Sequence, residues 1–342
     1  MSATSADTVF QYSKEFEGRI EALCAEKRDW PHYRQYVADH LGSENGRYAL
    51  FKRETLPEIE YHCGALSNQV VLDFGCGTGA STAALAERAK VVIAFDTDAR
   101  RVALCRMRLQ EHGLEDRVTF VSDQLPRRRV DLAVLNGVIE HIPATEPGLR
   151  ESVLSQVARA VGPGGHIFIN DTPNRLCPVD LHTTRLWWIP WTRPGSSWAY
   201  ARALAAGRFF ETPGSASGPR GLEEAGAWGT TFWALDSCLK KHGFSCLNLA
   251  QGHDRRLRYH PARPNARRRI FEALVYPIGL RFLRAPLTAF MPNLNNLVFR
   301  RSGADAASPP SPAASHARDP VEFDLPRRDP ISESGRPRSG GR

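Results

Sequence analysis

Short apolar runs alternate with longer amphipathic stretches through the centre of the chain. Between positions 69 and 169 the runs are four or five residues long, and the stretches between them repeat apolar residues every three or four positions. The first pattern is typical of buried strands and the second of helices, and their alternation indicates a parallel sheet built from βαβ units. The predicted strands are 70–74, 91–95, 118–121, 131–135 and 166–170, and the predicted helices are 81–90, 98–112 and 151–160. The glycine-rich segment 162–165 is expected as the turn that ends the last of these helices.

The same pattern continues toward the end of the chain. Apolar residues at helical spacing over 231–242 stop at Gly243, a common residue after the last turn of a helix. Two further strands are predicted at 244–249 and 296–300. The expected fold class is therefore α/β, with seven mostly parallel strands in one sheet and helices on both faces.

Four other segments flank or interrupt this pattern. Residues 1–62 carry apolar side chains at helical spacing, so we expect an N-terminal helical cap before the main domain at 63–301. That domain has two insertions, of which 172–229 is rich in Trp and 252–290 is rich in Arg. The tail at 302–342 has few large apolar side chains to offset chain entropy, so we expect it to be disordered.

The positive charge of the chain is concentrated in one segment. The formal net charge is +8, and residues 253–301 alone hold eleven Arg against two acidic residues. Such a segment attracts anions, so we expect either peripheral contact with an anionic membrane surface or a solvated face. No apolar run reaches the roughly 18 residues of a membrane span. The polar start and the seven cysteines without a CxxC pair favour a cytoplasmic chain with reduced thiols.

A glycine-rich turn follows the first predicted strand. The sequence there is VVLDFGCGTG, and its glycines allow the backbone to approach a ligand closely. This pattern predicts a nucleotide-type ligand held by Gly75, Gly77 and Gly79.

The residues around this turn distinguish two kinds of ligand. Ala80 completes a relaxed dinucleotide fingerprint and Asp96 lies at a suitable distance, so an NAD(P)-dependent oxidoreductase is one alternative. Asp73, two residues before the first glycine, is expected at the mouth of the pocket. There it would repel a pyrophosphate but pair with an ammonium group. A positively charged cofactor is therefore favoured.

These residues resemble the first motif of the class I, Rossmann-like methyltransferases that depend on S-adenosylmethionine. The resemblance covers about 70–169 and implies S-adenosylmethionine as the cofactor. It implies that Asp96 accepts hydrogen bonds from the ribose hydroxyls and that Asp123 faces the adenine amino group. Asn136 and Gly137, which end the fourth strand, are implied to lie near the amino-acid part of the cofactor.

Two histidines are candidates for a catalytic base. Methyl transfer from a sulfonium needs an aligned acceptor, exclusion of water and often one base. His141 follows the fourth strand beside Glu140, and His182 follows the fifth strand, where Asp180 is expected to orient its ring. Either histidine can act as a base near neutral pH or play a structural part. We expect no metal; the alternative is a site made of Glu140, His141 and a further carboxylate.

The sequence after the fourth strand also bears on the acceptor. Family members that methylate nucleobase amino groups have two prolines and an aromatic residue there, whereas this chain reads Asn-Gly-Val-Ile over 136–139. No nucleic acid partner is therefore expected. We expect a small-molecule, saccharide or lipid-linked acceptor, methylated at oxygen or carbon, with a nitrogen atom outside nucleobases as the open alternative. The Trp-rich insertion is expected either to cover the acceptor pocket or to form a small separate core. A catalytically silent relative that only binds the cofactor is the alternative from another class.

Overall fold

The structure is a computed structural model of the 342-residue chain. The residues that it describes are 10–27, 33–41, 46–122, 125–127, 129–211, 216–249, 279 and 282–303. The predicted tail lies outside these ranges from residue 304 onward. Most of the Arg-rich insertion, including all of 252–278, also lies outside them.

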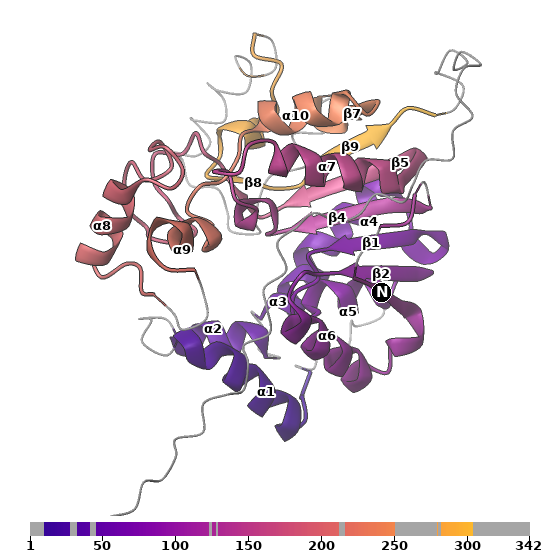
Figure 1. Cartoon of the computed structure of the whole chain (residues 1–342). Helices are drawn as coiled ribbons and strands as arrows, with labels where there is room; N and C mark the ends of the chain where they lie inside the picture. Colours follow the sequence, from indigo (N-terminus) through magenta and orange to yellow (C-terminus); the bar gives the residue numbers. More distant parts are fainter. Residues whose placement is uncertain are drawn as a thin grey trace, which may run out of the picture.

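One seven-stranded sheet forms the centre of the molecule (Figure 1). In spatial order its strands are β3 (Val118–Val121), β2 (Val91–Phe95), β1 (Val70–Phe74), β4 (Val130–Asn136), β5 (Val161–Asn170), β9 (Leu297–Arg301) and β7 (Phe244–Cys246). The strands β1 to β5 pair in parallel, and β9 is antiparallel to both of its neighbours. The predicted fold class is confirmed.

Helices cover both faces of the sheet. They are α4 (Leu56–Cys63), α5 (Ala80–Ala86), α6 (Ala99–His112), α7 (Leu149–Ala160) and α10 (Phe232–Lys240). Successive side chains of a strand point to opposite faces. Leu72 and Leu135 accordingly join the core that contains α7 and α10, while Val71 and Val134 join the core that contains α4 and α5. The two cores fix the carboxyl ends of β1 and β4 next to each other.

The strand β5 begins earlier than predicted. Its first residue is Val161, so the glycine-rich segment 162–165, expected as a turn, belongs to the strand. The pairing between β4 and β5 shifts register between Val130 and Leu132, as at a β-bulge. A Cβ on Gly165 would lie 2.7 Å from the carbonyl oxygen of Asp131. Glycine here permits a close approach of two strands rather than a reversal of the chain.

The N-terminal segment forms helices that pack against the domain (Figure 1). They are α1 (Lys14–Cys24), α2 (Tyr33–His40) and α3 (Arg47–Leu50), and α3 continues through a π-helical turn (Phe51–Thr55) into α4. Arg108 of α6 is buried and joins these helices to the glycine turn. Its guanidinium donates to the carbonyl oxygens of Thr78 at 2.8 Å and His40 at 2.6 Å, and to the hydroxyl of Tyr12. A buried guanidinium needs such acceptors, so Arg108 fixes the position of the cap.

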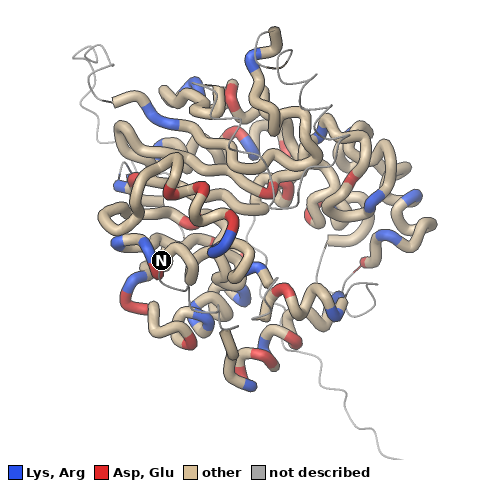
Figure 2. Tube along the Cα trace, turned by 180° about the vertical axis from the view of Figure 1, so that it is seen from behind, with Lys and Arg blue, Asp and Glu red and all other residues tan. Residues whose placement is uncertain are grey.

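The Trp-rich insertion forms a lobe beyond the ends of β4 and β5 (Figure 1). Its helices are α8 (Ser197–Ala205) and α9 (Gly218–Glu224). A separate core fills the lobe: Ile189, Ala199, Ala203, Phe209, Leu222, Ala227 and Trp228. The expectation of a small separate core is confirmed for these residues. Figure 2 shows several Lys and Arg positions along the lobe.

Short elements complete the described part of the chain. Two strands, β6 (Thr172–Pro173) and β8 (Asn293–Leu294), pair antiparallel outside the main sheet. Turns of 3-10 helix lie at Ala25–Lys27, Leu66–Asn68, Glu115–Arg117, Ile139–His141, Leu247–Leu249 and Leu287–Phe290. Among the described residues, no helix combines the length and apolar character that a membrane crossing requires.

We expect the substitution Arg108→Leu to lower the free energy of unfolding by about 2 to 4 kcal/mol, because three buried acceptors lose their donor. Urea denaturation measures this change. Arg106→Leu, at an exposed position of the same helix, is the matched control and should cost less than about 1 kcal/mol. Equal losses in the two variants would contradict the role of Arg108 as the link between cap and domain.

Candidate active site

The glycine turn between β1 and α5 has one face open to a ligand. Gly75, Gly77 and Gly79 have φ of +81°, +51° and +85°, in the left-handed region that favours glycine. A Cβ on Gly75 would lie 2.5 Å from Cγ2 of Val138, and one on Gly79 would lie 2.7 Å from Sγ of Cys105. A Cβ on Gly77 would meet no atom within 4 Å. Gly75 and Gly79 therefore allow packing, whereas Gly77 leaves space for a ligand.

Asp73 lies beneath this turn rather than at its mouth. Its side chain is 1% exposed, and Oδ2 accepts hydrogen bonds from the hydroxyls of Ser81 at 2.9 Å and Thr82 at 2.7 Å. Burial raises the pKa of Asp73 to about 6, although both hydrogen bonds favour the ionised form. The expected position at the pocket mouth is wrong, and the pairing with an ammonium group stays a prediction. The carboxylate instead fixes the first turn of α5 below the glycines.

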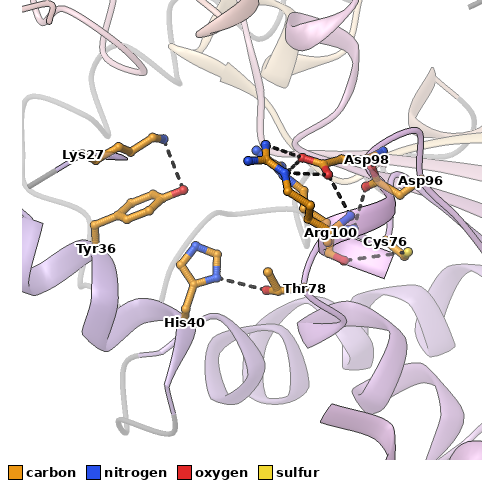
Figure 3. A network of polar contacts seen from close by, with 10 residues as sticks. Lys27, Tyr36, His40, Cys76, Thr78, Asp96, Asp98 and Arg100 are labelled. Atoms are coloured by element: carbon orange, nitrogen blue, oxygen red, sulfur yellow. Dashed lines mark hydrogen bonds and ion pairs between the residues drawn. The ribbon is translucent and has the colours of Figure 1, made fainter. Parts of the chain in front are cut away.

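Asp96 follows β2 and faces the glycine turn (Figure 3). Its Oδ2 accepts the N–H of Gly77 at 2.8 Å, and its Oδ1 accepts the N–H of Asp98 at 2.9 Å. A carboxylate oxygen can accept more than one hydrogen bond, so Asp96 orients Gly77 and retains acceptor capacity for ribose hydroxyls. Asp123, the residue expected near the adenine, lies outside the described residues.

The turn after β4 lies against the glycine turn. Oδ1 of Asn136 accepts a hydrogen bond from Nδ2 of Asn170 at 2.8 Å, and Gly137 has φ of +66°. The next residue, Val138, is the one that packs against Gly75. The structure thus brings Asn136 and Gly137 to the edge of the sheet where Gly77 is open, and their place near the amino-acid part of the cofactor stays a prediction.

The helical cap adds a residue that the sequence analysis missed. Nδ1 of His40 lies 3.0 Å from Oγ1 of Thr78 in the glycine turn, and Lys27 donates to the hydroxyl of Tyr36 nearby (Figure 3). Desolvation holds the pKa of His40 well below its ordinary value, so the ring is neutral. Its Nε2 is buried without a hydrogen-bond partner among the described residues. A single histidine outside any motif gave no signal in the sequence.

A buried carboxyl group is the centre of a second cluster. Glu140 is fully buried, and neither of its carboxyl oxygens has a hydrogen-bond partner in the described part of the chain. Its Oε1 lies 3.9 Å from Nε2 of His141 and 4.0 Å from Nε2 of His182. Burial raises the pKa of Glu140 to about 8. The structure therefore brings the two predicted histidines together around one carboxyl group.

Both histidines of this cluster are accessible and neutral. Their side chains are 44% exposed for His141 and 27% exposed for His182. Nδ1 of His141 lies 2.8 Å from the carbonyl oxygen of Glu224, which can only accept, so Nδ1 carries the proton and Nε2 keeps its lone pair. Desolvation is the main cause that lowers the pKa of each ring. Each ring is therefore neutral near pH 7 and offers a lone pair, while its lowered pKa makes it a weaker base than an ordinary histidine.

Asp180 fixes the loop that carries His182 but does not orient its ring. Its carboxylate accepts the backbone N–H groups of His182, Thr183 and Thr184 and the hydroxyl of Thr184. The carboxylate was expected to accept a hydrogen bond from the imidazole, but it accepts these backbone and hydroxyl hydrogen bonds instead. Gly226 approaches from the other side, where a Cβ would lie 2.8 Å from Cδ2 of His182 and 3.0 Å from Cγ of Glu140. Only glycine leaves room for both side chains.

Two charged residues hold the insertion against the turn after β4. Arg150 donates to the carbonyl oxygens of Ile142, Trp228 and Gly229, each at 2.7 Å. The carboxylate of Glu223 accepts hydrogen bonds from the backbone and side chain of the 144–145 segment at 2.6 to 2.8 Å. These contacts place His182 and Gly226 next to Glu140.

The same cluster contains donor atoms of the kind that bind metals. Glu140, His141 and His182 each offer one ligand atom, and these atoms lie within 4.8 Å of one another. Imidazole nitrogen and carboxylate oxygen suit several divalent ions. The third member is a histidine, whereas the sequence suggested a further carboxylate.

Comparison with known proteins identifies the family. The family model of a methyltransferase domain matches residues 30–249, which is more than half of the chain. The chain belongs to the class I S-adenosylmethionine-dependent methyltransferases. Membership of this family assigns S-adenosylmethionine as the cofactor, and the oxidoreductase alternative is wrong. The open backbone at Gly77 and the acceptor capacity of Asp96 fit this cofactor.

The methyltransferase is similar to several named proteins over part of its length. It is 33% identical over 107 residues to a probable cobalt-precorrin-6B C(15)-methyltransferase of Methanothermobacter thermautotrophicus. The aligned region is 30% of this chain and 52% of the relative. It is 30% identical over 121 residues to a ubiquinone biosynthesis O-methyltransferase of Azoarcus, and the aligned region is 34% of this chain and 49% of that relative. The crystal structure of precorrin 8w decarboxylase from Methanobacterium thermoautotrophicum is 30% identical, covering 34% and 62%, with a TM-score of 0.28. The chain spans about half the length of these curated relatives.

We expect Gly77→Ala to weaken S-adenosylmethionine binding by about tenfold or more, because the added methyl group enters the open face of the turn and φ is left-handed. Isothermal titration measures the affinity. Gly113→Ala is the matched control: Gly113 ends α6, has φ of +63° and also has no atom within 4 Å of the added Cβ. Both variants should lose similar stability, of about 1 to 2 kcal/mol, but only Gly77→Ala should lose affinity. Equal affinities would show that this face does not hold the cofactor.

The burial of Glu140 predicts a pH dependence of stability. Its pKa rises from an ordinary 4.5 to about 8 on folding, so the unfolded chain releases this proton first and stability falls as pH rises through that interval. Glu140→Gln removes the titration. Thermal unfolding at pH 5 and pH 8, interpreted by this linkage, should show the wild type losing stability relative to the variant at the higher pH. Parallel curves would contradict a protonated, buried Glu140.

Proposed function

We propose that the methyltransferase methylates an oxygen or carbon atom of a small-molecule, saccharide or lipid-linked acceptor, and that His141 and His182 remove the acceptor's proton. The observation that carries this proposal is the arrangement of the two Nε2 atoms around Glu140, beside the turn that follows β4. Asn136 and Gly137 of that turn lie next to the proposed cofactor face of Gly77.

The chain's own residues support a division of work between two adjacent sites. S-adenosylmethionine supplies, when bound, a methyl group on an electrophilic sulfonium. Gly77 and Asp96 are proposed to hold it, and Asp73 to support the turn from below. Nε2 of His141 keeps its lone pair, and the His182 side chain is 27% exposed, so we infer that either ring can accept the proton that an oxygen acceptor loses.

The names of the relatives support the acceptor class. One is named for methylation at a carbon, C(15) of a cobalt-precorrin, and the other for O-methylation in ubiquinone biosynthesis. Both names refer to small molecules, whereas another relative, 29% identical over 103 residues, is named a ribosomal RNA small subunit methyltransferase. The proposal of a non-nucleic-acid acceptor therefore rests on the residues at 136–139, which lack the two prolines and the aromatic residue.

Three other expectations stay proposals. They are the division into a cap at 1–62 and a domain at 63–301, a cytoplasmic location, and contact of the Arg-rich insertion with anionic lipid. The residues on which the last one rests, 252–278, lie outside the described part of the chain.

An acceptor screen tests the proposal against the catalytically silent alternative. The protein is incubated with cofactor labelled on its methyl group and with phenols, quinols, sugars and lipid extracts. We expect release of S-adenosylhomocysteine and a labelled product in at least one set. Cofactor binding without any turnover across the panel would favour the silent alternative.

Substitution of the histidines tests their part in proton removal. We expect His141→Ala or His182→Ala to lower kcat by about a hundredfold, with the affinity for S-adenosylmethionine unchanged, because a base acts only in the reaction step. His242→Ala is the control, since this histidine follows α10, lies 2.9 Å from Oγ of Ser155 in α7 and should be silent. Full activity in both active-site variants would exclude a histidine base.

Treatment with EDTA separates the base from a metal bound by the same cluster. Alignment and proton removal suffice for methyl transfer from a sulfonium, so we expect dialysis against EDTA to leave turnover unchanged. Loss of turnover that zinc or magnesium restores would assign Glu140, His141 and His182 to a metal ion instead.

A further inference from the structure

Exposed apolar side chains gather on the Trp-rich insertion. Ten large apolar side chains are exposed among the described residues, and seven of them lie between positions 176 and 204. We call these seven the tryptophan surface: Leu176, Leu181, Trp187, Trp188, Trp191, Trp198 and Leu204. Each of its four Trp residues is 48 to 55% exposed. Scattered single apolar residues are common on proteins, but a cluster marks a contact with a partner or a membrane.

Direct contacts join the four tryptophans into one surface. The ring centroids of Trp187 and Trp188 are 6.0 Å apart, and those of Trp188 and Trp191 are 5.0 Å apart. The guanidinium of Arg202 lies 5.2 Å from the ring centre of Trp198 and donates to the carbonyl oxygen of Trp187 at 3.0 Å. Arg202 therefore connects α8 to the preceding loop.

The backbone of the loop holds these rings toward solvent. Arg185 and Trp188 have φ of +56° and +72°, a region that is unfavourable for residues with a Cβ. The N–H of Trp188 donates to the carbonyl oxygen of Pro178 at 2.6 Å, and Val179 pairs with Trp187 in an antiparallel bridge. The separate core of the lobe is already filled by Trp228 and its neighbours, so the exposed rings are not needed there.

Positive charge accompanies the tryptophan surface. Between positions 176 and 211 there are four Arg and two acidic residues. The acidic Asp180 is buried and saturated by the hydrogen bonds of its own turn, so it contributes little to the surface. Figure 2 shows basic positions along this lobe. The positive side chains are Arg185, Arg193, Arg202 and Arg208.

We propose that the tryptophan surface binds the interface of a lipid bilayer that contains anionic lipid. Trp has a large apolar ring and one N–H donor, and it favours the headgroup level of membranes. Arg202 beside Trp198, with the other arginines of the same segment, matches the phosphates of anionic headgroups, and this charge favours a bilayer over an apolar protein partner. The absence of a membrane-crossing helix among the described residues fits contact from one side. This inference concerns a second surface and does not rest on the proposed acceptor chemistry.

The test is cosedimentation of the full chain with vesicles. We expect binding to vesicles of phosphatidylcholine and phosphatidylglycerol, weaker binding at high salt, and weaker binding to phosphatidylcholine alone. The double variant Trp187→Ser/Trp198→Ser should reduce the bound fraction about tenfold, because two of the four interfacial rings are lost. Quenching of Trp fluorescence by brominated lipid should decrease in parallel.

A matched control removes an exposed ring elsewhere. Tyr61→Ser, at a position 45% exposed, should bind vesicles as the wild type does. The Arg-rich stretch at 252–278 is intact in both variants, so unchanged binding in the Trp variant would overturn the proposal and assign binding to that stretch. Loss of self-association in the Trp variant, with vesicle binding unchanged, would overturn it in favour of a second copy of this chain. Thermal unfolding checks that both variants are folded.

Discussion

The active site depends on the hydrogen bonds by which Arg150 fastens the Trp-rich insertion to the turn after β4. Its guanidinium reaches Ile142 on one side and the 228–229 backbone on the other. Desolvation lowers the pKa of Arg150 to about 10, but the group stays charged at neutral pH. A buried cation is stable only while its acceptors remain in place. The same contacts fix Gly226 against Glu140 and His182, so the two halves of the cluster cannot separate without exposing unpaired groups.

The glycine turn depends on a comparable support from the opposite direction. Arg108 links Thr78 of the turn to the helical cap, and Asp73 holds the first turn of α5 from below. Asp96 then orients Gly77 from the side. Each support is a charged side chain with its acceptors or donors satisfied, so the open face at Gly77 is rigid before a ligand arrives. Preorganisation of this kind lowers the entropy cost of binding.

The sequence predicted the sheet well because each apolar run ends at a polar or glycine residue that also ends the strand. The bounds of β1, β2 and β3 agree with the predicted ones. Glycine misled the prediction at Gly165, since close packing and chain reversal need the same residue. The orientation of Asp73 and the partners of Asp180 depend on side-chain geometry that spacing does not encode. His40 and Thr78 are 38 positions apart, and no local pattern connects them.

The exposed fractions of the cluster show from which side an acceptor can enter. Glu140 is fully buried and forms its floor, whereas 44% of the His141 side chain and 27% of the His182 side chain face outward. A proton accepted at either Nε2 would therefore lie between the buried Glu140 carboxyl group and the solvent-exposed side of the imidazole ring. Gly226 closes the site laterally, because it leaves no space for a second side chain beside His182. The loop that carries His182 also carries Leu176 and Leu181 of the tryptophan surface. One of the two proposed histidine bases and part of the proposed bilayer contact therefore lie on the same loop.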